Sequence, residues 1–328
     1  MSGARRQAHP EAPAHAGWRE ALRAGLRDSP VHFDAPLRRA VTLRVGGPAD
    51  ALVELESERD LVAACEFAHA QHLPLHVLGR GSNVLVRDEG LRGLVLRLGQ
   101  AFRALTVDLG AREARAGAGL ANATFVEQCR LHGLGGMEFL VAIPGSIGGA
   151  IAMNAGAHDG ETAGFLRSVR YYEAGTGVRS APADAFAFAY RHSPLRANEG
   201  RLVLGGTFQL QPMADAEIRA RRERFQQWRR EHQPREYPNC GSVFKNPPGD
   251  YAARLIDAAG LKGHRIGDAQ VSEKHANFIV NRGDATAAEV LALVDAIRET
   301  VRSRTGIVLE LELQVFPLPS GAREAATS

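Results

Sequence analysis

The sequence predicts an α+β protein of three packed units, and three observations indicate this class. Strand-like apolar segments alternate with glycine-rich loops over the first two units, whereas the third contains clear helical patterns. The glycine loop Gly79–Asn83 runs into the strand-like segment Val84–Val86, where a Rossmann unit would begin a helix. The segment Ile307–Phe316 alternates strictly between apolar and polar residues, which predicts a final strand.

Composition and charge indicate an ordinary globular protein with a sizeable core. The 328 residues are 45% hydrophobic and 23% charged, and the formal net charge is +3. This charge suits a small anionic ligand and is too weak to demand a nucleic-acid partner. The histidines show no metal-ligand pairing, so we expect no metal site. The three cysteines form no CxxC pair, which favours a reducing compartment: Cys65, Cys129 and Cys240.

The N-terminal residues lack the apolar stretch of a signal peptide, so we expect a disordered tail there. The longest uncharged run, 139–157, contains Pro144 and four glycines, which predicts a loop and not a membrane helix. We therefore expect a cytoplasmic protein with no membrane partner. The expected divisions are a tail at 1–28, a first unit at 29–98, a second at 99–213, a third at 214–318 and a tail at 319–328.

Local signals predict the elements of the first two units. A turn at Gly46-Gly47-Pro48 precedes a strand that ends near Leu55, and Ser57 followed by Asp60 predicts the start of a helix. We expect further strands at 75–78, 84–86, 94–98, 169–172 and 202–210, and a short helix at 124–131.

Helix signals are strongest in the third unit. The highly charged stretch 214–235 predicts a connecting helix, and a second helix at 251–259 should stop at Gly260. Thr286 and Glu289 form a capping-box pattern. The helix that follows should end at Gly306 and carries one apolar stripe: Val290, Val294, Ile297 and Val301.

Two glycine loops are candidates for a nucleotide site. The loop at 79–83 could hold a phosphate through converging backbone N–H groups, or it could be a tight turn between strands. The loop at 143–157 is rich in small residues, which allow close approach to a planar or phosphorylated ligand or close packing of the core. Both alternatives remain open from the residues alone.

A third candidate site is the segment 239–248. In an extended chain Ser242 and Asn246 share a face, with Lys245 close by. A cation beside a hydroxyl favours the alkoxide left after proton donation, so Ser242 could be a general acid. An ordinary turn before a helix is the alternative. Cys240 is most simply a small buried thiol.

Two further segments carry candidate charged residues. On the final strand Glu310, Glu312 and Gln314 share one face, which either is solvated or lines a cleft. Arg191 could clamp a substrate carboxylate with two hydrogen bonds, or it could be a surface arginine.

Taken together in chain order, these segments resemble the UDP-N-acetylenolpyruvoylglucosamine reductase (MurB) family, in its shorter subtype. The resemblance spans most of the chain and rests on seven stretches: TLRVGGPAD (42–50), GRGSNVLV (79–86), IPGSIGGAIAMNAGA (143–157), YRHS (190–193), NCGSVFKNP (239–247), GDAQVSEKHANFIVN (267–281) and LELELQVF (309–316).

The resemblance implies a two-subdomain PCMH-type FAD-binding module, similar to vanillyl-alcohol oxidase, followed by an α/β substrate-binding domain. It implies that NADPH is the reductant and that UDP-N-acetylglucosamine enolpyruvate is the substrate reduced, in peptidoglycan precursor synthesis. By the same resemblance, FAD is held non-covalently by Gly79, Gly81, Ser82, Asn83, Pro144, Gly145, Gly148, Gly149, Asn154 and Gly156.

The resemblance also assigns the reacting groups. Ser242 is the proton donor, while Arg191 and Glu312 polarise the substrate carboxylate and stabilise the charge that develops. The remaining substrate contacts are Tyr190, Lys245, Asn246 and His275. A carboxylate placed beside the substrate carboxylate is repelled unless it is protonated or bridged, so we expect a raised pKa for Glu312.

The sequence departs from the family pattern at three positions. Asp159 stands where the family usually has glycine, and Gln314 stands where it usually has arginine, which puts substrate anchoring there in doubt. Glu310 is a second acid on the Glu312 face, so the choice between the two depends on the register of the strand.

Two other functions are compatible with parts of the sequence. An FAD oxidase of the related fold would lack the 239–247 loop and the YRHS tetrad. A nucleic-acid-binding helix at 219–235 is the second rival, but its interspersed glutamates and glutamines favour a solvated connector. We expect a monomer.

Overall fold

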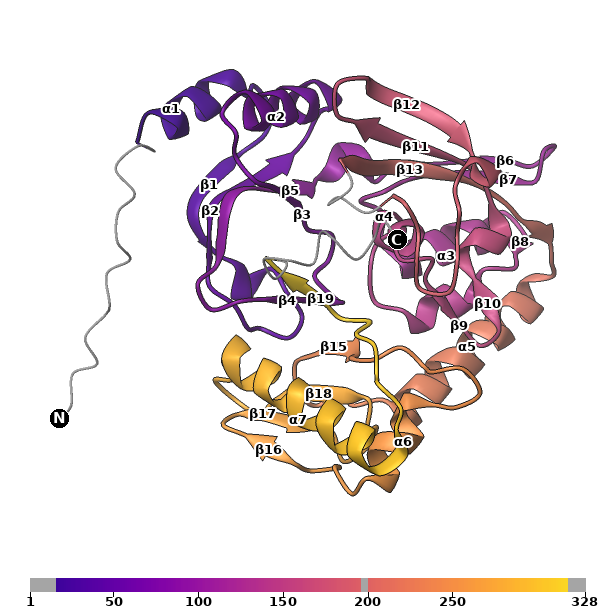
Figure 1. Cartoon of the computed structure of the whole chain (residues 1–328). Helices are drawn as coiled ribbons and strands as arrows, with labels where there is room; N and C mark the ends of the chain where they lie inside the picture. Colours follow the sequence, from indigo (N-terminus) through magenta and orange to yellow (C-terminus); the bar gives the residue numbers. More distant parts are fainter. Residues whose placement is uncertain (1–15, 196–199, 318–328) are drawn as a thin grey trace.

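The computed structural model describes residues 16–195 and 200–317. Within these residues the strands form three larger sheets, one in each of the three parts visible in Figure 1. The mixed helix and strand content confirms the predicted α+β class.

The first sheet has the strand order β1–β2–β5–β3. β1 is antiparallel to β2, whereas β2, β5 and β3 are parallel to one another. Ser57 accepts a hydrogen bond from the Asp60 N–H and caps helix α2, which confirms the predicted helix start. The strand bounds are β1 (Val31–Pro36), β2 (Pro48–Leu55), β3 (Leu75–Val77) and β5 (Leu91–Leu98), and those of the helix are α2 (Glu58–Ala70).

The prediction of a tail over 1–28 is wrong for its second half. Helix α1 (Ala16–Gly25) buries Trp18 and Leu22 in the core of the first unit. The residues after it are fixed because the buried Asp60 carboxylate accepts the N–H groups of 27, 28 and 29. The i, i+4 spacing of Trp18 and Leu22 was the available helix signal. Residues 1–15 lie outside the described part.

The second sheet is antiparallel, with the order β12–β11–β13–β7–β6. The predicted strands at 169–172 and 202–210 lie in β11 and β13, whereas the other three strands were not expected. Helices α3 (Asn122–Leu131) and α4 (Ile147–Ala152) belong to the same unit. The strands are β6 (Leu105–Asp108), β7 (Glu113–Gly117), β11 (Leu166–Glu173), β12 (Gly177–Pro182) and β13 (Arg201–Gln209).

The third sheet is also antiparallel and has the order β15–β18–β17–β16. The Thr286–Glu289 capping box is present at the start of α7, and Gly306 ends that helix at φ 75°. Both predictions are confirmed, as is the burial of the apolar stripe. The elements are β15 (Asn239–Ser242), α6 (Ala252–Ala258), β16 (Arg265–Ile266), β17 (Ala269–Val271), β18 (Phe278–Asn281) and α7 (Ala287–Thr305).

Two segments tie the third unit to the others. Helix α5 (Asp215–His232) buries Ile218 and Phe225, and Phe225 belongs to the core of the second unit. Strand β19 (Gln314–Phe316) returns to the first unit and pairs in parallel with β4 (Val84–Val86), as Figure 1 shows. The strand predicted at 307–316 is therefore ladder-paired only at its end, with a single bridge between Leu311 and Phe244 before it.

The cores do not follow the predicted divisions of the chain strictly. Leu43 and Leu85 pack in the core of the third unit, and Tyr172 packs in that of the first. The boundaries at 98 and 213 therefore stay a prediction, and the tail at 319–328 lies outside the described residues. None of the helices in the described ranges is long and apolar enough to cross a membrane.

The remaining elements are short. Two-residue strands are β8 (Leu134–Gly135), β9 (Gly156–Ala157), β10 (Gly160–Glu161) and β14 (Gln211–Pro212). The 3-10 turns are η1 (Leu37–Arg39), η2 (Gln100–Phe102), η3 (Glu138–Ala142), η4 (Thr162–Phe165) and η5 (Ala183–Ala185).

Candidate active site

A cavity of about 1000 Å³ is lined by residues of all three units. This volume is at the upper end of the roughly 300–1,000 Å³ found for ligand pockets, so it has room for a large cofactor or for a cofactor and a substrate together. Arginines outnumber carboxylates by five to three among the described lining residues, which favours anionic ligands such as phosphates.

The two glycine loops lie side by side on the wall of this cavity. The Ser82 hydroxyl of the first loop donates a hydrogen bond of 2.6 Å to the Pro144 carbonyl oxygen of the second. A Cβ placed on Gly79 or Gly149 would meet only the Ser146 hydroxyl, at 3.2 and 3.8 Å. These two glycines therefore leave their space to the cavity.

Other glycines of the same loops are needed for packing. A Cβ on Gly81, which has φ +63°, would lie 2.4 Å from the Ala40 carbonyl oxygen. A Cβ on Gly148 would lie 2.8 Å from the Ala118 Cβ. The loops thus combine both functions that the sequence left open, since some glycines admit a ligand and others let the backbone pack closely.

Arg191 stands on a tight turn of the second unit. Ala189 and His192 exchange backbone hydrogen bonds, and Arg191 between them has φ +53°, which non-glycine residues rarely adopt. The turn is held by Asn154, whose side chain donates to the Ala189 carbonyl oxygen, and by Ser193, whose hydroxyl donates to the Ala152 carbonyl oxygen. This turn directs the guanidinium to the cavity.

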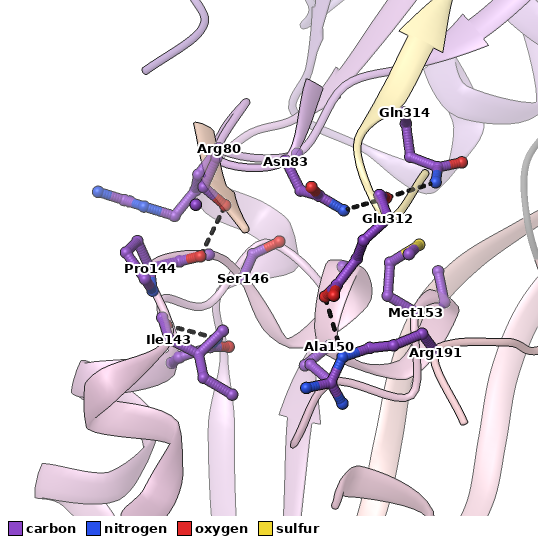
Figure 2. A pocket seen from close by; sticks show the side chains of 18 of the residues that line it. Arg80, Asn83, Ile143, Pro144, Ser146, Ala150, Met153, Arg191, Glu312 and Gln314 are labelled. Atoms are coloured by element: carbon purple, nitrogen blue, oxygen red, sulfur yellow. Dashed lines mark hydrogen bonds and ion pairs between the residues drawn. The ribbon is translucent and has the colours of Figure 1, made fainter. Parts of the chain in front are cut away.

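Arg191 is paired with Glu312, and it also donates to the Gly156 carbonyl oxygen at 2.6 Å. Arg191 Nε donates to Glu312 Oε1 at 2.9 Å, and the two side chains are 17% and 18% exposed (Figure 2). Glu310 points elsewhere and pairs with Lys245 at 3.2 Å. The register therefore places Glu312, and not Glu310, in the cavity wall.

The pKa of Glu312 is raised above its ordinary value, as predicted, but mainly for a different reason. Burial disfavours the charged carboxylate, and the charges of Arg191 and Lys245 only partly offset this effect. The expected cause, repulsion by the substrate carboxylate, would raise the pKa further.

Ser242 lies at the end of β15, next to the segment that carries Glu312. The Val243 carbonyl oxygen accepts the Glu312 N–H at 2.9 Å, so Ser242 and Glu312 lie on neighbouring segments of the chain. Gly241 before it has φ +77° and faces the Ser82 carbonyl oxygen of the first glycine loop. The serine hydroxyl thus lies where the third unit meets the predicted cofactor loop.

The predicted substrate contacts divide into two groups. Tyr190, Asn246 and His275 line the cavity, although the Asn246 side chain also accepts the Ala252 N–H at the start of α6. Burial lowers the pKa of His275, which favours its neutral form. Lys245 does not line the cavity and instead pairs with Glu310.

One predicted cofactor contact, Asn154, is not on the cavity wall. Its side chain is fully buried, accepts the Ala163 N–H and donates to the Ala189 carbonyl oxygen. Its structural position is that of a support for the Arg191 turn. Cys240 is buried with a pKa raised to about 12 by burial, so it is an inert thiol as predicted.

Comparison with known proteins decides the family. The C-terminal domain of UDP-N-acetylenolpyruvoylglucosamine reductase matches residues 233–316, and an FAD-binding domain matches residues 49–178. The UDP-N-acetylenolpyruvoylglucosamine reductase 2 of Symbiobacterium thermophilum is 45% identical over 299 residues, which are 90% of this chain and 96% of that protein. The chain belongs to the UDP-N-acetylenolpyruvoylglucosamine reductase family.

Other members of this reductase family support the same conclusion over the full length. The Streptococcus pneumoniae reductase is 40% identical and is covered to 98%. The crystal structure of the Thermus caldophilus enzyme superposes with a TM-score of 0.74 at 38% identity, covering 88% of this chain and 99% of that one. The predicted resemblance and the predicted flavin-binding fold are confirmed.

The reductase cavity fits the FAD that the family implies. Its volume suffices, Gly79 and Gly149 leave open space beside the loops, and the lining arginines supply positive charge for a pyrophosphate. The residues available to hold the cofactor are those of the two loops, and Arg80 of the first loop is among them (Figure 2).

Several residues in the reductase cavity wall had no recognisable signal in the sequence. Isolated arginines at 97, 103 and 201 could not be told from surface residues. Trp228 of α5 and His158 also line the cavity, and their rings meet edge to face at 4.9 Å. The charged helix therefore does more than connect two units. Asp159 and Gln314, two of the three departures from the family pattern, are both in the wall.

Proposed function

We propose that this chain reduces the enolpyruvyl ether of UDP-N-acetylglucosamine enolpyruvate to UDP-N-acetylmuramate, with NADPH as reductant and FAD as non-covalent cofactor. Membership of the reductase family and the matched FAD-binding domain support the reaction and the cofactor. The observation that carries the proposal at the level of residues is the Arg191–Glu312 pair, in a cavity lined by both glycine loops and Ser242.

The residue roles follow from the charge that the reaction develops. The two glycine loops would hold FAD, which would supply to the methylene carbon of the enolpyruvyl group the hydride taken from NADPH. Negative charge then develops on the adjacent carbon and its carboxylate, and the Arg191 guanidinium is placed to stabilise it. Ser242 donates its hydroxyl proton to that carbon, and the alkoxide regains a proton from water.

The charges around Glu312 support this assignment. Glu312 has a raised pKa, so it accepts a proton more readily than an exposed glutamate and is repelled less by the substrate carboxylate. The Lys245 ammonium lowers the Glu312 pKa, although Lys245 itself does not line the cavity. Tyr190, Asn246 and His275 would contact the substrate.

The cellular setting is part of the proposal. UDP-sugar reduction of this kind serves peptidoglycan precursor synthesis, and we propose that the chain does so as a monomer in the cytoplasm. The arginines of α5 support no rival function, because several are paired with neighbouring carboxylates, as in Arg219–Asp215, Arg221–Glu217 and Arg222–Glu127.

An absorption spectrum of the purified protein, followed by anaerobic addition of NADPH and then of substrate, tests the function. The flavin band should bleach with NADPH and recover when UDP-N-acetylglucosamine enolpyruvate is added. A matched addition of UDP-N-acetylglucosamine, which lacks the enolpyruvyl group, should leave the flavin bleached. A colourless protein that FAD cannot reconstitute would contradict the proposal. So would a flavin that is reduced by an alcohol and reoxidised only by oxygen.

A further inference from the structure

The backbone of Glu312 is held by two side-chain amides from different parts of the molecule. Asn83 Nδ2, in the first glycine loop, donates to the Glu312 carbonyl oxygen at 3.0 Å. Gln314 Nε2 donates to the same oxygen at 2.9 Å, and Figure 2 shows the two amides converging on it. The Gln314 N–H in turn donates to the Asn83 carbonyl oxygen at 3.1 Å.

These bonds fix the direction of the Glu312 side chain. Glu312 lies two residues before the start of β19, and Asn83 and the 312–314 segment continue the β4–β19 ladder by one step. The Glu312 carbonyl oxygen is held toward the first unit, while its carboxylate meets Arg191 of the second unit at 2.9 Å (Figure 2). The Glu312 N–H also donates to the Val243 carbonyl oxygen at 2.9 Å, so both peptide groups that flank the Glu312 Cα are held by hydrogen bonds.

We propose that Asn83 and Gln314 are positioning residues that clamp Glu312 for substrate reduction, and that the Asn83 side chain is not a cofactor ligand. This inference rests on the proposed function, in which Glu312 acts on the substrate. Nδ2 of Asn83 already donates to the Glu312 carbonyl oxygen. A phosphate would therefore be bound by other N–H and hydroxyl groups of the loop, and not by this one.

Gln314 also sets the charge beside Glu312. An arginine at this position, usual in the family, would add a cation near the carboxylate, whereas glutamine supplies a hydrogen-bond donor without charge. Burial is then the largest influence on the Glu312 carboxyl, with Arg191 and Lys245 opposing it. Gln314→Arg therefore keeps a donor and adds a charge, whereas Gln314→Ala removes the donor and adds nothing.

The test separates the two half-reactions by rapid mixing, using holoenzyme variants Asn83→Ala and Gln314→Ala. Flavin reoxidation by saturating substrate should slow about tenfold or more in each, because a displaced catalytic group loses its alignment. Flavin reduction by NADPH, the Kd for FAD and the substrate Kd should stay within about twofold. Gln270→Ala is the matched control, since Gln270 Nε2 donates one comparable bond to the Gly263 carbonyl oxygen away from the cavity.

Gln314→Arg supplies the readout that a merely structural role would not move. Its reoxidation rate should stay closer to that of the wild type than the rate of Gln314→Ala does. The limb of its pH profile that reports the ionisation of Glu312 should shift to lower pH, because the added cation lowers the Glu312 pKa. If Asn83→Ala does not fold, the two Gln314 variants carry the test by themselves.

Three results would overturn the clamp. A Kd for FAD raised tenfold in Asn83→Ala, with both half-reactions slowed, would make Asn83 a cofactor ligand. A substrate Kd raised in Gln314→Ala at unchanged saturating rate would make Gln314 a substrate anchor. Unchanged reoxidation in both alanine variants would remove the positioning role. Failure of the proposed function would be distinct, because wild-type flavin would then not reoxidise with substrate.

Discussion

The third unit is joined to the first unit and to the second in different ways. Toward the first unit, the hydrogen bonds involve backbone atoms, in the β4–β19 ladder and where side chains bond to carbonyl oxygens. Thr42 Oγ1 donates to the Asn239 carbonyl oxygen at 2.7 Å, and Asn281 Nδ2 donates to that of Leu43 at 3.1 Å. Leu43 and Leu85 complete this junction by packing in the core of the third unit.

Toward the second unit, the junction at the site is made by side chains. Arg191 reaches Glu312 from a two-residue turn with a left-handed backbone, and that turn depends on the Asn154 amide beneath it. Ser242 and Glu312, which we call the rigid half of the site, are therefore tied to the first unit by backbone hydrogen bonds. The Arg191 cation, the fragile half, comes from a strained turn on the other side. The alignment of Arg191 is expected to be the more fragile half of the site.

The largest expected effect on the rate of substrate reduction comes from a substitution at Ser242, in the rigid half of the site. Ser242→Ala removes the proton donor, and general acids typically contribute about 10²–10⁴-fold, so substrate-driven flavin reoxidation should slow by that factor. Reduction of the flavin by NADPH should be unchanged, because it needs no proton from this hydroxyl. Stopped-flow absorbance of each half-reaction measures both rates.

Ser303→Ala, on the exposed face of α7, controls for loss of a serine hydroxyl and should match the wild type in both half-reactions. Full turnover by Ser242→Ala would show that another group donates the proton.

The second effect comes from the strained half. Arg191→Met should slow substrate reduction by about 10²–10³-fold, as loss of one charge-stabilising donor does elsewhere. It should also alter stability with pH, because Arg191 lowers the Glu312 pKa, so its removal raises that pKa further. A carboxyl with a raised folded pKa costs stability as pH rises above its ordinary value of 4.5, and the cost levels off above the raised value.

The stability difference between Arg191→Met and the wild type should therefore widen between about pH 4 and pH 8, measured by denaturant unfolding. In a Glu312→Gln background the widening should vanish, because no carboxyl remains to titrate. Arg167→Met, whose guanidinium donates to the Gln209 side-chain oxygen, controls for loss of a charge. A difference independent of pH would contradict the coupling of Arg191 to Glu312.

The fragile and rigid halves also differ in how well the sequence predicted them. Ser57, the Thr286–Glu289 box and Gly306 were found because caps are local signals that involve residues within one helical turn. The choice of Glu312 over Glu310 followed from motif register, and strand alternation alone left it open. The burial alternation of the 307–316 segment does hold, even though most of it lacks ladder pairing.

Long-range contacts explain what the sequence did not predict. The segment after helix α1 is held by Asp60, which is more than 30 residues away, and such a contact leaves no local pattern. Asn154 lies within a glycine-rich motif, yet its side chain supports the backbone at 189. Lys245 lies on the face of its segment that points away from the cavity, and it pairs with Glu310 instead.

The smallest expected effect tests the junction between the first and third units at a distance from the cavity. The Asp88 carboxylate accepts the N–H groups of Ala287 and Ala288, at 2.8 and 2.9 Å, and so caps α7 from another unit. Asp88→Ala should cost about 1 kcal/mol, as loss of a helix cap does, and should speed amide exchange at 287 and 288. Asp88→Asn, which keeps one acceptor oxygen without the charge, should cost less.

Turnover should fall by less than about threefold in Asp88→Ala, because the β4–β19 ladder still holds Glu312 in place. Asp295→Ala removes the same charge from the exposed face of the same helix and should change neither exchange nor turnover. A large loss of turnover in Asp88→Ala alone would mean that the cap, and not the strand pair, fixes the third unit over the cavity. The rigid half of the site would then depend on a single carboxylate.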